Sequence, residues 1–168
     1  MTRIYVNPGY WWRNNVSLAV LVIVAIYGVW ELWRAAGVTG EDALPGYLFG
    51  AAFVGGAVYG LWTTINDARD RVTAFDMDEA SGASRAEFWR PFWTEKLEGA
   101  RSDVGDWRLH VAIGNRSVKT FFIYANHKRY PRPLQFELRQ GIDVAGLQKV
   151  APEAVAEYGR AIGMTPAA

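Results

Sequence analysis

Two apolar stretches decide the architecture of this chain: residues 16–33 read VSLAVLVIVAIYGVWELW, and residues 47–65 read YLFGAAFVGGAVYGLWTTI. The shorter stretch would form a helix roughly 27 Å long, close to the about 30 Å hydrocarbon core of a bilayer. Each stretch is apolar on all sides and lacks the polar stripe of a helix on the surface of a soluble protein. The sequence therefore predicts a transmembrane helical hairpin over residues 16–65.

The distribution of charge separates this hairpin from the rest of the chain. Only six charged residues precede Ile65, and all the others follow it. The net charge of +1 provides no general basic field for nucleic acid. The chain has no cysteine, which excludes disulfides, thiol catalysis and Cys-ligated zinc. We expect residues 66–168 to form a polar domain at the membrane, with no nucleic-acid partner.

A cleaved signal peptide is the alternative interpretation of the first stretch. Arg3 and Arg13 would supply its basic region. However, the apolar run is longer than the usual 7–15 residues of a signal peptide. It also ends in Trp30, Trp33 and Arg34 instead of a small-residue cleavage site. The hairpin is therefore the favoured interpretation.

Aromatic residues flank the two predicted spans, and several of them lie in residues 1–15. These are Tyr5, Tyr10, Trp11 and Trp12. Rings that are partly apolar and partly hydrogen-bonding favour the headgroup level of a bilayer. We therefore expect residues 1–15 to form an N-terminal interfacial segment.

The charges around the spans predict the orientation of the hairpin. The connection at residues 35–46 carries the acidic Glu41 and Asp42 and no Lys or Arg. Basic residues lie on the other side of both spans, at Arg3, Arg13, Arg69 and Arg71. By the positive-inside rule both termini face the cytoplasm. The expected location is a bacterial inner (plasma) membrane.

Small residues at a spacing of four mark one face of the second span: Ala52, Gly56 and Gly60. Such a face allows another helix to approach closely. One alternative is that the first span of the same chain packs there. The other is association with another membrane protein or with a second copy of the chain. Neither span has a charge at its centre, which argues against an ion pathway or a transporter.

The polar domain alternates strand and turn patterns before ending in a helix. Residues 107–113 and 134–139 alternate with period two, and residues 118–125 are rich in β-forming residues. The alternation places Trp107, Leu109, Val111 and Ile113 on one face. It also predicts that Leu134, Phe136 and Leu138 face inward and that Gln135, Glu137 and Arg139 face outward. Residues 71–77 and 85–89 predict a further strand pair with a turn at 81–83, and a second turn is expected at 114–116. Pro152 begins an amphipathic helix that Gly163 ends, with an inner face formed by Val155, Tyr158, Gly159 and Ile162. About five mostly antiparallel strands and a C-terminal helix predict a small α+β domain. A curved sheet closed by that helix, as in pleckstrin-homology-like folds, is one candidate.

A basic loop at residues 127–133 contains three residues that are candidates for headgroup contact: Lys128, Arg129 and Arg132. Two prolines stiffen this loop. Close to a cytoplasmic leaflet, each basic residue would gain about 1 kcal/mol from anionic lipids. The alternatives are an ordinary solvated strand connection and a contact with another protein.

An aromatic cluster at residues 89–93 is a candidate docking site. Its members are Trp89, Arg90, Phe92 and Trp93. Tryptophan and arginine are favoured as anchors of protein interfaces. Alternatively, the cluster belongs to the core or lies at the membrane interface.

The sequence carries no motif for a catalytic, metal-binding or cofactor-binding site. His110 and His127 are its only histidines, and nothing in the sequence proposes a partner for either. The favoured hypothesis is a non-enzymatic accessory or scaffold subunit that holds the small domain at the membrane for a larger complex. Two alternatives remain: an anionic-lipid-binding module, and a membrane-bound enzyme of unknown reaction with a buried polar cluster around His110.

Overall fold

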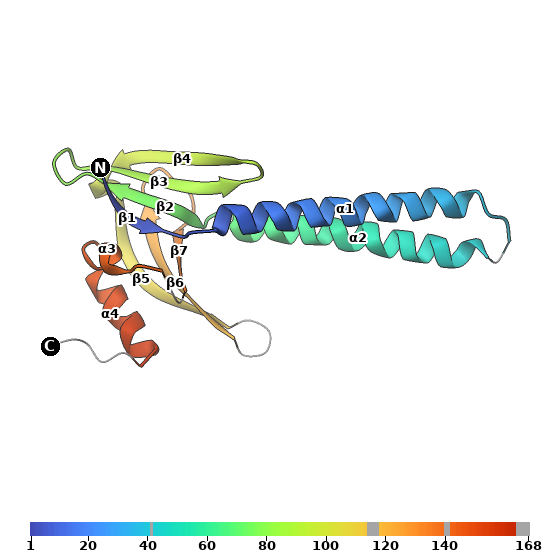
Figure 1. The fold of residues 1–168 in the computed structure, drawn as a ribbon. Coiled ribbons are helices and arrows are strands. Elements are labelled where there is room, and N and C mark those ends of the chain that lie inside the picture. Colours follow the sequence, from blue (N-terminus) through green and yellow to red (C-terminus); the bar gives the residue numbers. More distant parts are fainter. Residues whose placement is uncertain (41, 114–117, 140–141, 164–168) are drawn as a thin grey trace. The chain divides into compact units, whose positions relative to one another are not determined.

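The computed structural model describes residues 1–40, 42–113, 118–139 and 142–163. It contains two compact units, which are shown in Figure 1. The helical unit comprises residues 11–68. The β unit combines residues 1–10 with the chain from Arg69 onward. The N-terminal segment thus packs with the C-terminal part of the chain. The predicted turn at 114–116, and Glu41 of the predicted acidic connection, lie outside the described residues.

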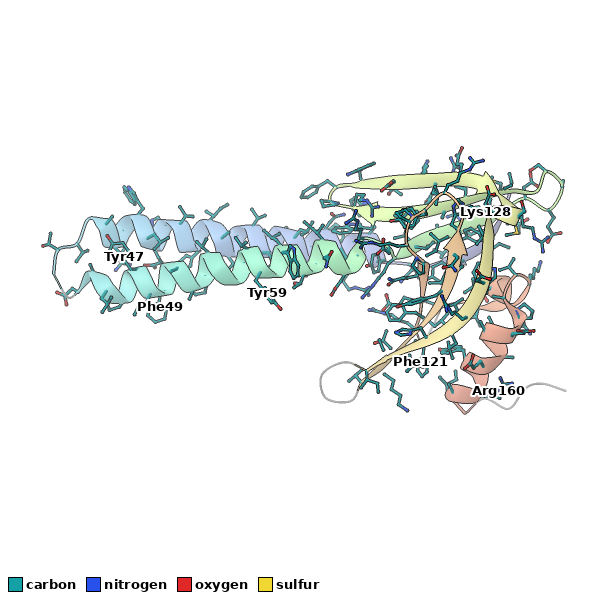
Figure 2. The ribbon with its side chains drawn as sticks, turned by 180° about the vertical axis from the view of Figure 1, so that it is seen from behind. Tyr47, Phe49, Tyr59, Phe121, Lys128 and Arg160 are labelled. Carbon is teal, nitrogen blue, oxygen red and sulfur yellow. The ribbon has the colours of Figure 1, made fainter. Side chains whose placement is uncertain are left out.

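The helical unit consists of two long apolar helices, α1 (Tyr10–Ala36) and α2 (Ala43–Ala68). Both are long and apolar enough to cross a membrane. Large apolar side chains cover their outer surface, including Ile26, Phe49 and Tyr59, which are each more than 60% exposed. Phe49 and Tyr59 are labelled on α2 in Figure 2. The two predicted helices are confirmed, and each extends beyond the apolar stretch that predicted it.

One sheet of the β unit contains four antiparallel strands. They are β1 (Thr2–Val6), β2 (Val72–Met77), β3 (Ala83–Arg90) and β4 (Trp93–Ala100), paired in that order. The strand β1 lies in the segment for which the sequence predicted only an interfacial location. Arg3 fixes it by donating to both carboxylate oxygens of Asp76, at 2.7 and 3.0 Å.

A β-bulge in β1 explains how such a short strand contributes two adjacent side chains to the core. The register with β2 shifts between Arg3 and Tyr5. In a regular strand, neighbouring side chains point to opposite faces. The extra residue in the bulge breaks this alternation, and Ile4 and Tyr5 are both buried.

The second sheet contains three antiparallel strands. They are β5 (Val104–Ile113), β6 (Lys119–His127) and β7 (Leu134–Leu138), paired in that order. A 3-10 turn, η1 (Arg101–Asp103), links the two sheets. Side chains of both sheets form one core, in which Phe136 makes edge contacts with Phe75 of β2 and Tyr5 of β1. The described residues thus contain seven strands, where the sequence predicted about five.

The predicted strand faces are confirmed for part of this sheet. Leu134, Phe136 and Leu138 are all buried, as their alternation predicts. On β5 the prediction is wrong beyond Leu109. Val111 is 39% exposed and Ile113 is 73% exposed, whereas Leu109 packs against the core.

Two helices follow the strands: α3 (Ala145–Gln148) and α4 (Pro152–Ala161). Gly146 permits α3 to touch β1, because a Cβ atom there would lie 2.0 Å from the carbonyl oxygen of Ile4. Pro152 begins α4 as predicted, and Gly163 follows it with a φ of 76°. Ile162, predicted on the inner face, is 41% exposed. The β unit is thus a small antiparallel domain with a C-terminal helix.

Candidate functional site

Both connections to the helical unit leave the β unit at one end of the four-stranded sheet. Strand β1 ends at Val6, which pairs with Ala74. The next amide, of Asn7, donates to the carbonyl of Thr73 at 2.9 Å. Strand β2 begins at Val72, so its start lies beside the end of its antiparallel neighbour (Figure 1). We call this the connection end. The helical hairpin is therefore inserted between two adjacent strands.

A buried carboxylate joins the two connections. Glu137 of β7 is 1% exposed, although the sequence alternation predicted that it faces outward. Its Oε2 accepts a hydrogen bond from Asn7 at 3.4 Å and lies 3.6 Å from Nη1 of Arg71. Arg139 pairs with the other carboxylate oxygen. Because a buried charge needs partners, this cluster holds Asn7 and Arg71, one from each connection, against the same side chain.

Tyr5 completes the surroundings of Glu137 from the core side. Its hydroxyl donates to the backbone carbonyl of Glu137 at 2.8 Å. Burial raises the pKa of the Tyr5 hydroxyl, and the negative charge of Glu137 raises it further. The hydroxyl thus stays protonated and remains a donor at physiological pH.

Asp70, in the second connection, anchors the loop between β6 and β7. The Tyr130 hydroxyl donates to Asp70 Oδ1 at 3.0 Å, and Arg132 Nη1 donates to Oδ2 at 3.3 Å. The ring of Tyr130 stacks on Phe88, with centroids 5.1 Å apart. Burial raises the pKa of Tyr130. The structure therefore places Arg132 at the connection end.

The other two basic candidates lie elsewhere. Lys128 Nζ and Arg129 Nε lie 3.8 and 3.7 Å from the carboxylate oxygens of Asp103. Asp103 also accepts a hydrogen bond from the backbone amide of Ala100. This hydrogen bond is the main reason why the pKa of Asp103 is lowered. Ala100 pairs with the first residue of β3, so this group lies away from the connection end. Figure 2 labels Lys128 there. The three predicted headgroup ligands thus divide between two carboxylates.

The aromatic cluster at residues 89–93 also divides. Trp89 is 1% exposed and belongs to the core, which leaves it out of any surface contact. Arg90 donates to the backbone carbonyls of Arg69 and Trp89, at 2.8 and 3.0 Å, and pairs with Glu95. Phe92 and Trp93 are 71% and 58% exposed. We call these last two residues the aromatic tip.

A tight turn carries the aromatic tip. Arg90 pairs directly with Trp93, which leaves only Pro91 and Phe92 in the turn. Phe92 has a φ of 67°, in the left-handed region. Proline followed by a left-handed residue is the pattern of a type II turn, in which glycine is preferred at the second position. A bulky aromatic residue here is unusual.

The residues of the small-residue face of α2 lie in two different environments, one against α1 and one exposed. A Cβ atom at Gly60 would lie 2.8 Å from Leu21 of α1, so Gly60 belongs to the packing within the hairpin. Gly56 has open space at that position, and Ala52 is exposed. Within the hairpin, Gly50 of α2 faces Gly28 of α1, which the sequence analysis did not single out.

The two histidines have different environments. His110 is exposed on β5 and stacks on Tyr124, with ring centroids 4.8 Å apart, so the buried polar cluster proposed around it does not form there. His127 is buried, and its Nδ1 accepts the amide of Arg129 at 3.1 Å. Burial lowers the His127 pKa. In the described part of the chain, no group of His, Asp and Glu is arranged to hold a metal ion.

Comparisons with protein-family models, with curated proteins and with solved structures found no match. The interpretation of the connection end therefore depends on its own geometry.

A groove of about 490 Å³ lies at the other end of the four-stranded sheet. It is lined by Met77, Arg101, Trp107 and Val150, among others. Met77 ends β2, Arg101 begins η1, Trp107 lies in β5, and Val150 lies between α3 and α4.

Proposed function

We propose that the protein is a non-enzymatic accessory or scaffold subunit of a bacterial inner membrane, which holds its β unit at the cytoplasmic surface for a larger complex. The observation that supports this proposal is the insertion of the apolar hairpin between β1 and β2. Both connections leave at one end of a sheet. With the hairpin in the bilayer, that end of the β unit faces the membrane and both termini lie in the cytoplasm.

The connections are suited to holding a domain rather than tethering it loosely. Three residues separate Val6 from Tyr10, and three separate Ala68 from Val72. The end-to-end distance of a flexible linker increases with its length. With three residues each, neither connection can act as a long flexible linker. The hydrogen bond and ion pair to Glu137 restrict both of them further. Two short connections keep the connection end of the β unit within a few residues of the proposed spans, as a scaffold requires.

For the fold of the β unit we propose a pleckstrin-homology-like topology, on the order of elements alone. Two antiparallel sheets are followed by the C-terminal helix α4. This assignment implies no ligand, because one fold supports many functions.

For the membrane contact of the subunit we propose the outward side of α2 at Ala52 and Gly56. Open space at Gly56 would let the backbone of another helix approach closely. The partner is another membrane protein or a second copy of the chain. Gly60 is excluded from this contact, because Leu21 already occupies the space beside it.

The decisive experiment is native electrophoresis and pull-down of the tagged full-length protein from its own membranes in mild detergent. We expect a larger stoichiometric complex, which the substitution Gly56→Leu weakens. Val58→Leu is the matched control, since Val58 is an exposed α2 residue that already carries a large side chain. Recovery of the chain alone, or an unchanged complex in Gly56→Leu, would contradict the proposal.

The membrane topology can be tested separately, because the chain lacks cysteine. Single cysteines at Val38, between the helices, and at Glu79, in the β2–β3 turn, would report opposite sides of the membrane. We expect an impermeant maleimide to label Val38→Cys in intact cells. Glu79→Cys should react only after lysis. The reverse pattern would place the β unit outside the cytoplasm.

The proposed function does not require the basic loop to bind lipid headgroups. Lys128 and Arg129 share Asp103, and Arg132 pairs with Asp70. Two carboxylates therefore balance two of these three positive charges within the β unit.

A further inference from the structure

We propose that the aromatic tip, Phe92 and Trp93, inserts into the interfacial layer of the bilayer that α1 and α2 cross, and so forms a third attachment of the β unit. This inference rests on the proposed function, since it requires the helical hairpin to lie in a membrane. It adds a lipid contact made by the β unit itself.

The position of the tip is the first argument. Strand β3 pairs with β2 so that Phe88 opposes Val72, the first residue after the second connection. Two residues further along β3, Arg90 donates to the carbonyl of Arg69 at 2.8 Å. The β3–β4 turn therefore lies at the connection end, as Figure 1 shows within the β unit. Because the connections are so short, this end cannot move far from the helix ends and thus from the membrane surface.

The chemistry of the tip is the second argument. Among the described residues of the β unit, Phe92 and Trp93 are the only Phe, Tyr or Trp residues with exposed side chains. Tryptophan is enriched at membrane interfaces, where its ring has apolar surroundings and its N–H meets the headgroups. Arg90, beside the tip, is paired with Glu95. The contact we infer is thus with the bilayer interface through the rings and needs no particular anionic headgroup.

The backbone of the turn is the third argument. Phe92 occupies a left-handed conformation that glycine adopts without steric cost. A strained residue at an exposed turn is often associated with function. Here the turn places a large apolar ring at its outermost position.

The test uses the full chain reconstituted into vesicles of phosphatidylcholine and phosphatidylglycerol that contain a nitroxide-labelled phosphatidylcholine. An environment-sensitive fluorophore is attached to a single cysteine in Phe92→Cys and, independently, in Trp93→Cys. Glu79→Cys is the negative control, because Glu79 is exposed at the opposite end of the same sheet. Ile26→Cys is the positive control, because Ile26 is exposed on α1.

We expect blue-shifted emission and several-fold stronger quenching at positions 92 and 93 than at position 79. If position 26 is quenched while positions 92 and 93 resemble position 79, the inference is overturned and the membrane hairpin stands. That outcome would leave the tip as a surface for a protein partner. If position 26 is also unquenched, the hairpin is outside the bilayer, and the proposed function is overturned with the inference.

Discussion

Phe92 and Gly82 occupy the same kind of backbone conformation in two turns of one sheet. Their φ angles are 67° and 65°. At Gly82, between β2 and β3, the chain uses the residue that avoids steric cost. At Phe92, between β3 and β4, it retains a bulky side chain. The contrast indicates that the second turn is not optimised for stability, and it can be tested directly.

We expect Phe92→Gly to stabilise the β unit by about 1 kcal/mol, because the left-handed region costs an ordinary residue about 1–2 kcal/mol relative to glycine. Chemical unfolding of the detergent-solubilised protein would measure this. The same variant should lose part of the membrane contact inferred for the tip. A lower stability for Phe92→Gly would show that the ring contributes to folding.

Gly82→Ala is the matched control, and its expected effect on the stability of the β unit is opposite to that of Phe92→Gly. A Cβ atom at Gly82 would meet no atom within 4 Å, so the substitution changes only the backbone preference. We expect a destabilisation of about 1 kcal/mol. No change would mean that the turn adjusts its conformation.

The environment of His127 predicts a pH dependence of stability. Burial lowers the pKa of His127 in the folded protein, whereas the unfolded chain keeps a value near 6.5. As the pH falls below about 6.5, the unfolded state therefore binds a proton that the folded state does not, and stability decreases. One proton accounts for at most about 1.4 kcal/mol per pH unit. Thermal unfolding between pH 7.5 and 5 would reveal the slope.

His127→Asn should reduce that slope, because an asparagine side chain does not titrate and can still accept the Arg129 amide. His110→Asn is the control, since His110 is exposed on β5. Equal slopes in all three proteins would assign the pH dependence to other groups.

At the scale of the elements, the spacing of four residues that predicted the small-residue face of α2 does not follow the side of α2 that packs against α1. Residues four apart on a helix drift around it by about 40° per step. The series Ala52, Gly56 and Gly60 therefore turns away from a single neighbour, and only Gly60 meets Leu21. Alternate steps of three and four keep to one side. A sequence pattern alone could not show which side faces α1.

Gly60→Leu tests this division of the helix surface. The added side chain would collide with Leu21, and overpacking of this kind costs about 1–3 kcal/mol. In mixed detergent micelles, we expect the helical hairpin of the Gly60→Leu variant to unfold at a lower denaturant concentration than that of the unmodified protein. Gly56→Leu should leave the hairpin stability unchanged, because its side chain points into open space. Equal effects would contradict the assignment of the two faces.

The strands differ in how much of each could be predicted. Strands β2, β3, β5, β6 and β7 lie close to predicted segments, because their apolar residues alternate or cluster. Strand β4 was not predicted. Its sequence, WTEKLEGA, lacks a regular apolar alternation, and it pairs on one side only, with β3. No side chain of β4 is fully buried, so its sequence lacks the apolar pattern that reveals a strand with one buried face.

At the scale of the whole molecule, the connection end is formed by pairing between strands that are distant in the sequence, and no local sequence pattern reveals that pairing. The sequence predicted the aromatic and basic candidates but not their distribution between core, connection end and distant surface. That distribution follows from the pairing of β3 with β2 and β4, which places residues 90–93 at the connection end. It also follows from Asp70 and Asp103, which hold the basic residues at separate places. Glu137 was expected to face solvent because alternation describes one strand, whereas its burial comes from Asn7 and Arg71 on other segments.

Replacing residues 8–69 by a short Gly/Ser linker should yield a soluble, folded β unit, because β1 and β2 are adjacent and antiparallel. A version that lacks residues 1–7 should not fold. It loses the buried Ile4 and Tyr5, each worth about 1.5–3 kcal/mol of a domain stability of about 5–15 kcal/mol. Circular dichroism melting would compare them. Identical melting curves would show that β1 is dispensable.

The inserted hairpin also sets an order of events during synthesis. Strand β1 leaves the ribosome before β2, and Arg3 must wait for Asp76, 73 positions later, before it can pair. The apolar helices emerge in between and, in the proposed topology, enter the membrane. The β unit therefore completes its core only after the hairpin has been made. If the helices span a bilayer as proposed, both strands must meet on the same side of it, and a chain with one helix misinserted could not close the sheet. In the proposed topology, folding of the β unit would therefore depend on correct membrane insertion, and chains that insert wrongly would expose an incomplete core to proteolysis.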